Sequence, residues 1–93
     1  MVVGILTLKI MIPGSHSLKD KRRALRSIKD RLRGQYNVSV AEVDAQDVWQ
    51  TAVLGVAAAG VDRPSVEGQL DSVISLVRGS SQVVLARSGK EFV

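Results

Sequence analysis

The stretch VVGILTLKIMIPGSHSLKDKRRALRSIKDRLRG, residues 2–34, changes its hydrophobic period halfway along, and this change decides the fold. Residues 2–12 alternate between two faces that are both largely apolar, a pattern typical of a strand in the centre of a sheet. Pro13-Gly14 ends that strand. Ser17 is a suitable N-cap, so the sequence predicts a helix over residues 18–33.

The predicted helix carries two stripes of different chemistry. Leu25, Ile28 and Leu32 share an apolar stripe that can pack on a sheet, and we expect Gly34 to cap the helix. A second stripe beside it is basic. Residues 19–33 hold eight Lys or Arg and two Asp, so this segment has a net charge of +6, whereas the whole chain has +4.

The rest of the chain supplies four more elements. Strands are predicted over residues 36–43 and 48–59, and the short polar link between them predicts a hairpin. A second amphipathic helix follows the N-cap Asp62 and ends at Gly79, and a last strand covers residues 82–87. This order predicts one α+β domain over all 93 residues, with the ferredoxin-like βαββαβ fold. Its four-stranded antiparallel sheet would have both helices on one face.

The composition excludes several kinds of site. The chain has no cysteine and a single histidine, so disulfides, thiolate metal sites and multi-histidine clusters are impossible. We expect neither a metal nor another cofactor. The apolar start is too short to span a bilayer and lacks the features of a signal peptide, so we expect a cytoplasmic protein without membrane contacts.

Two sets of residues could support catalysis or metal binding. His16 would need a nucleophile and an orienting carboxylate, while Glu42, Asp44 and Asp47 could together hold Mg²⁺. Both sets have ordinary structural explanations, a histidine in a loop and aspartates in a turn. We therefore expect no enzymatic activity, and leave open whether these residues meet.

The basic helix is the strongest functional signal. Its cations predict a surface that contacts the phosphates of RNA: Lys19, Lys21, Arg22, Arg23, Arg26, Lys29 and Arg33. The preceding turn adds a candidate anion site at a helix N-terminus, formed by Gly14, Ser15, His16 and Ser17. Because Ser17 and Asp20 are also capping residues, the same turn could be purely structural.

The sheet face away from the helices is predicted to be apolar. It would expose Val3, Ile5, Thr7, Met11, Trp49 and Val53. Aliphatic side chains offer no ring on which a base can stack, so this face favours self-association over RNA recognition. We expect a homo-oligomer, a dimer first, although a small apolar ligand is an alternative.

The motifs IPGSHSLKDKRR and NVSVAEVDAQDVWQTAVLGVA make the chain resemble the YlxP-like family of small bacterial proteins of unknown function. The resemblance implies the ferredoxin-like fold and carries no known catalytic residues. Members are often encoded among translation genes, which implies RNA or the ribosome as partner. The recurring polar residues of the family correspond here to Ser15, His16, Lys19, Lys21, Arg22, Glu42, Asp44, Gln46, Asp47, Trp49 and Gln50.

These observations lead to two hypotheses. The first is a non-enzymatic RNA-binding or ribosome-associated accessory protein that contacts phosphates through its first helix and the turn before it. The alternative is a homo-oligomeric interaction module, or a small-ligand-binding module, that uses the open face of the sheet.

Overall fold

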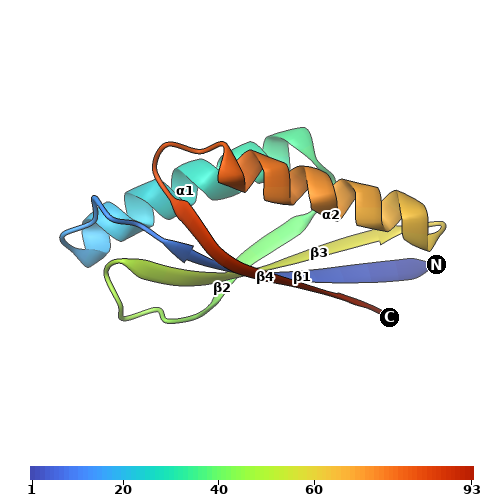
Figure 1. The fold of residues 1–93 in the computed structure, drawn as a ribbon, viewed down its shortest axis with the longest axis horizontal. Helices are drawn as coiled ribbons and strands as arrows, with labels where there is room; N and C mark the ends of the chain where they lie inside the picture. The colour runs from blue at the N-terminus through green and yellow to red at the C-terminus, as the bar shows by residue number, and fades with distance from the viewer.

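A computed structural model describes residues 1–93 and contains the six predicted elements in the predicted order (Figure 1). Their bounds are β1 (Val2–Met11), α1 (Leu18–Gln35), β2 (Ser39–Asp44), β3 (Thr51–Gly60), α2 (Arg63–Arg78) and β4 (Val84–Phe92). The fold is therefore ferredoxin-like α+β, as the sequence predicts.

The four strands form one antiparallel sheet in the order β2-β3-β1-β4. Figure 1 shows both helices on the same side of this sheet. The two termini lie at one end, where Val3 and Val93 exchange backbone hydrogen bonds of 2.9 and 2.8 Å. Neither helix is long and apolar enough to cross a membrane.

The core fills the space between the sheet and the helices. Every second residue of the two central strands faces the helices and is buried, including Leu6, Leu8 and Ile10 of β1. The helices contribute Leu25, Ile28, Leu32, Val66, Leu70, Val73 and Val77. This arrangement explains the two periods of the sequence, because a strand repeats its face every two residues and a helix about every 3.6.

The end of α1 differs from the prediction. Gly34 is not the C-cap, because the helix continues to Gln35 and Tyr36 is the cap. The Tyr36 backbone N–H donates to the Leu32 carbonyl at 2.9 Å, and the Tyr36 ring packs against the core. The core contact of Tyr36 thus extends the helix past Gly34 to Gln35. Gly34 therefore does not adopt a left-handed conformation.

The strand boundaries also differ from the prediction. β2 begins at Ser39 instead of residue 36, and β3 begins at Thr51 instead of residue 48. The connection is therefore a six-residue loop, residues 45–50, in which Ala45 has a positive φ of 59°. β4 is longer than predicted because it pairs with β1 as far as Phe92.

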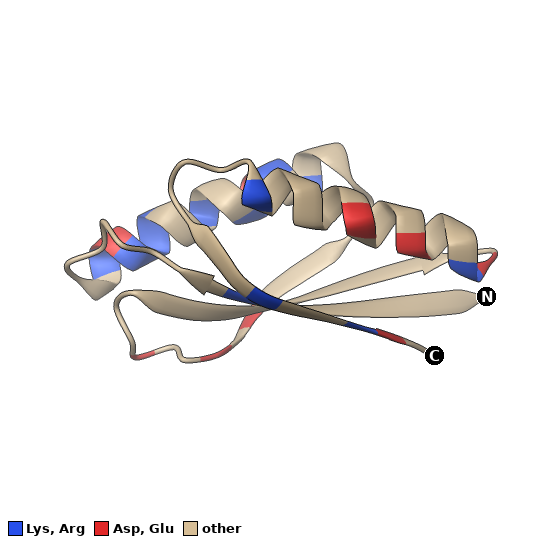
Figure 2. Ribbon diagram, viewed as in Figure 1, with Lys and Arg blue, Asp and Glu red and all other residues tan.

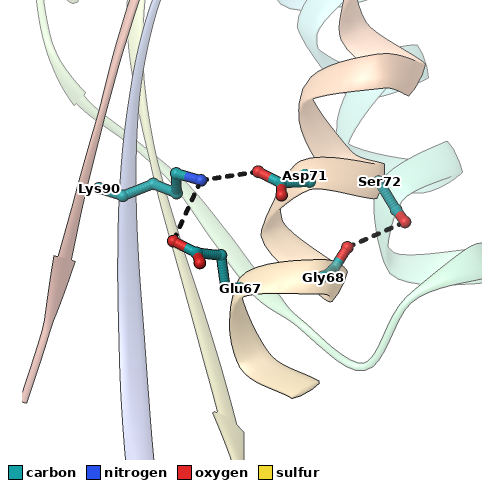
Figure 3. A network of polar contacts seen from close by, with 5 residues as sticks. All are labelled: Glu67, Gly68, Asp71, Ser72 and Lys90. Carbon is teal, nitrogen blue, oxygen red and sulfur yellow. Dashed lines mark hydrogen bonds and ion pairs between the residues drawn. The ribbon is translucent and has the colours of Figure 1, made fainter. Parts of the chain in front are cut away.

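Lys90 of β4 connects the edge of the sheet to α2 (Figure 3). Its Nζ lies 2.7 Å from Asp71 Oδ1 and 3.4 Å from Glu67 Oε2. The hydrogen bond to Asp71 and the negative charges of both carboxylates raise the pKa of Lys90 above its ordinary value of 10.5, although partial desolvation opposes the shift. The ion pairs therefore favour the folded chain while Lys90 is protonated.

We expect this contribution to disappear at alkaline pH. A group whose pKa is higher in the folded chain stabilises it fully below the pKa of the unfolded chain, and this stabilisation is lost as the pH rises through the folded pKa. Wild type should therefore have a higher Tm than Lys90→Met at about pH 8–9, and the difference should vanish above the raised pKa. Thermal unfolding followed by circular dichroism at increasing pH tests this. A difference that persists unchanged at the highest pH would contradict it.

Candidate functional site

Lys and Arg residues recur along α1 (Figure 2), and most of them are exposed. The exposed members of this basic stripe are Lys19, Arg22, Arg23, Arg26, Arg31 and Arg33, and Lys29 is half-buried. The ion pairs of the structure involve Lys21 and Lys90 alone, so none of these seven cations is neutralised by a carboxylate of the chain. The stripe thus keeps its positive charge available to a partner.

Four of these cations line a groove between α1 and the edge strand β2. Arg22, Arg26, Lys29 and Arg33 surround a hollow of about 340 Å³, to which Asp30 and Glu42 also contribute. Arg33 is anchored there, because its Nη2 donates to the Val40 carbonyl of β2 at 2.6 Å. From Lys19 to Arg33 the stripe follows α1 for about 21 Å, at 1.5 Å per residue.

Lys21 does not belong to this surface, so its prediction as an RNA contact is wrong. The residue is 1% exposed. Its Nζ lies 2.7 Å from Glu42 Oε2 and donates to the Ala45 carbonyl at 2.6 Å. The sequence did hold a signal, because Lys21 is four residues before Leu25 and shares the apolar stripe of the helix.

The turn before α1 uses its polar groups internally. Ser15 is buried, and its hydroxyl donates to the Ser17 carbonyl at 3.0 Å. The Ser17 hydroxyl accepts from the Asp20 N–H, and the Asp20 carboxylate accepts from the His16 N–H, both at 3.1 Å. Ser15 therefore acts within the turn, which corrects its prediction as an anion ligand, and Ser17 caps the helix, while Gly14 and His16 are exposed.

Two of the acidic residues, Glu42 and Asp44, have partners within the chain. Glu42 pairs with Lys21, and Asp44 Oδ1 accepts a hydrogen bond of 2.8 Å from the Ala45 N–H. Asp47 is exposed in the loop. No group of three or more His, Asp or Glu side chains comes together in a way that could hold a metal ion.

Some of the polar residues that carry the family resemblance lie close together at one end of the fold. Gln50 Nε2 donates to the Ser15 carbonyl at 3.0 Å, and the Gln50 carbonyl accepts from the Ile12 N–H at 2.8 Å. Together with the contact of Lys21 to Ala45, these bonds hold the 45–50 loop against the start of α1. In this structure, these polar residues therefore hold the 45–50 loop in place.

The face of the sheet away from the helices is uncovered. Val3, Ile5 and Val53 are half-buried there, and Thr7 and Met11 are exposed, as expected for the uncovered side of the two central strands. Trp49 is not a residue of β3, which corrects the prediction that it lies on this face as part of the strand. It lies in the 45–50 loop, 53% exposed, since β3 begins two residues later.

Sequence reasoning assigned no role to two cations on this open face. Lys9 of β1 and Arg87 of β4 are register partners, so they stand side by side, and both line a hollow with Thr7 and Val53. Neither forms an ion pair within the chain. The sequence did not reveal that Lys9 and Arg87 are neighbours, because the pairing of β1 with β4 joins residues that are far apart in the sequence.

Comparison with known proteins agrees with the motifs described above. Residues 3–88 match the family described as "Protein of unknown function (DUF503)". The chain is also 33% identical over 76 residues to the uncharacterized protein YlxP of Bacillus subtilis (strain 168), an alignment that covers 82% of this chain and 83% of YlxP. Since the family match and this relative both extend over most of the chain, the protein belongs to the DUF503 family.

Proposed function

We propose that the protein is an RNA-binding accessory protein without enzymatic activity, which contacts RNA, free or within the ribosome, through the basic stripe of α1. The observation that carries the proposal is the absence of ion pairs between the stripe and the chain's own carboxylates. Like charges three and four residues apart destabilise a helix by a few tenths of a kcal/mol per pair. An anionic partner would relieve this repulsion.

The chemistry of the stripe favours contact with phosphates over the reading of bases. The chain has three aromatic residues, and none of them lies on α1. The helix has no aromatic rings on which bases can stack, whereas its Lys and Arg side chains bind phosphate oxygens of any sequence. Binding should therefore depend strongly on salt and weakly on RNA sequence.

The test is the affinity for a fluorescently labelled RNA hairpin and for ribosomes at increasing salt. If four cations each neutralise one phosphate, affinity should fall about 100-fold between 50 and 200 mM salt. The variant with Lys19→Glu, Arg22→Glu and Arg26→Glu should lose most of its binding and most of this salt dependence. These side chains are exposed, so the variant should keep the helical content and Tm of wild type.

A matched pair of single changes separates local contact from net charge. Arg26→Glu and Arg78→Glu both reverse one exposed arginine on a helix, but Arg78 lies at the end of α2. Binding should weaken for Arg26→Glu and change little for Arg78→Glu. Wild type that binds neither probe at 50 mM salt, or equal losses for the two arginines, would reject the proposal.

A further inference from the structure

We infer that the open face of the sheet is the interface of a homodimer, in which two copies pack face to face about a two-fold axis that runs along the strands between β1 and β3. This axis places β3 over β1 of the second copy and β2 over its β4. The inference is independent of RNA binding, because it uses the side of the sheet away from α1 (Figure 1).

The open face is large enough for such an interface. The strands have 10, 6, 10 and 9 residues. At about 3.3 Å per residue and a strand spacing of about 4.8 Å, the face has a projected area of roughly 550 Å². The accessible area exceeds this projection and so approaches the 800 Å² or so that each partner buries in a stable complex. The face is mostly apolar, and neither helix covers it.

Charge complementarity selects the direction of the axis. One row of register partners crosses the sheet in the order Asp44, Val53, Lys9 and Arg87. The row is therefore negatively charged at the β2 edge and positively charged toward the β4 edge. Asp44, Lys9 and Arg87 have no ion-pair partner within the chain. An axis along the strands brings Asp44 over Arg87 of the second copy, whereas an axis across the strands would place β2 over β2 of the second copy and so keep Asp44 away from Arg87 of β4.

The sizes of the side chains select the same arrangement. On the open face β1 carries larger residues, among them Ile5 and Lys9, and β3 carries smaller ones, among them Gly55 and Ala57. Ile5 is the register partner of Ala57, so the axis along the strands places Ile5 of each copy over Ala57 of the other. Large residues that face small ones allow two surfaces to interdigitate.

The first test is the oligomeric state. Sedimentation equilibrium should show a dimer for wild type at micromolar concentration. Ala57→Arg, which places a charge in the centre of the face, should be a folded monomer by circular dichroism, and the control Ser75→Arg on the exposed side of α2 should remain a dimer. A monomeric wild type, or a dimeric and folded Ala57→Arg variant, would overturn the inference.

A charge exchange tests the interface without relying on Ala57→Arg. Asp44→Arg and Arg87→Asp should each weaken the dimer at least about tenfold, because each places like charges opposite one another. The double variant restores opposite charges across the interface and should recover most of the affinity. Recovery supports the row-to-row contact, and a double variant weaker than both single variants contradicts it.

Cross-linking tests the direction of the axis. The chain has no cysteine, so introduced cysteines are unique. Ala41 and Gly89 occupy opposite ends of the row through Gly55 and Thr7, and the proposed axis brings Ala41 over Gly89 of the second copy. With a short bis-maleimide, Ala41→Cys/Gly89→Cys should form covalent dimers and each single variant should not. Efficient cross-linking of Ala41→Cys alone would overturn the proposed axis.

Discussion

Replacement of Lys21 by alanine is expected to lower the free energy of unfolding by about 3–5 kcal/mol, the cost of removing one partner of a buried ion pair. The ammonium group lies 2.7 Å from Glu42 Oε2 and is the only cation that forms an ion pair with this carboxylate. The change also removes the hydrogen bond to the Ala45 carbonyl, which holds the 45–50 loop against α1. Urea unfolding of the variant measures the loss.

Lys19→Ala is the matched control, because Lys19 is exposed in the same turn of α1. It should change stability by no more than about 0.5 kcal/mol. The double variant Lys21→Met/Glu42→Leu removes both charges and keeps similar volumes, so it should recover most of the stability lost in Lys21→Ala. Equal stability of Lys21→Ala and Lys19→Ala would show that the buried pair contributes nothing.

Gly4→Ala is expected to destabilise the fold by about 1–3 kcal/mol, because it forces an extra methyl group into a filled site. A Cβ atom at Gly4 would lie 2.5 Å from Val66 Cγ1 and 2.8 Å from Leu70 Cδ1 of α2. The absence of a side chain at this position is what allows α2 to pack so close to β1. The free energy of unfolding, measured in urea, tests the expectation.

Two variants separate this steric effect from the general effect of replacing glycine. Gly68→Ala makes the same chemical change at an exposed position of α2 with open space around it, and should stabilise the helix by about 0.5–1 kcal/mol. Gly4→Ala/Val66→Ala removes the closer of the two contacts, the one with Val66 Cγ1. Its total cost should therefore be smaller than the sum of the two single costs. Strict additivity would contradict the close contact.

The two proposed surfaces can work together. In the proposed face-to-face dimer the helix layers would point outward, because both helices lie on the other side of the sheet (Figure 1), so each copy would present its own α1 stripe. Two stripes on one particle would bind a long RNA or a ribosome more tightly than one stripe, by raising the effective concentration of the second contact. Ala57→Arg should then weaken binding to large RNA more than binding to a short hairpin.

Local pattern in the sequence was sufficient for the architecture. The period-two residues of β1, the N-caps Ser17 and Asp62, and the C-cap Gly79 all lie where the sequence predicts them. The exposed cations of α1 were also predictable, since a position on a helix fixes which side chains share a stripe. These features depend on residues within a few positions of one another, so the chain specifies them without its tertiary partners.

The tertiary structure determined which residues that are distant in the sequence contact one another. The position of Lys21 on the apolar stripe of α1 was visible in the sequence, but its partners Glu42 and Ala45 come to it only through the tertiary structure. Trp49 lies outside β3 because the 45–50 loop that contains it is held by Lys21 and Gln50. The row from Asp44 to Arg87 exists because four strands pair in one register. Burial, pairing and register depend on contacts across the fold, and no local pattern contains them.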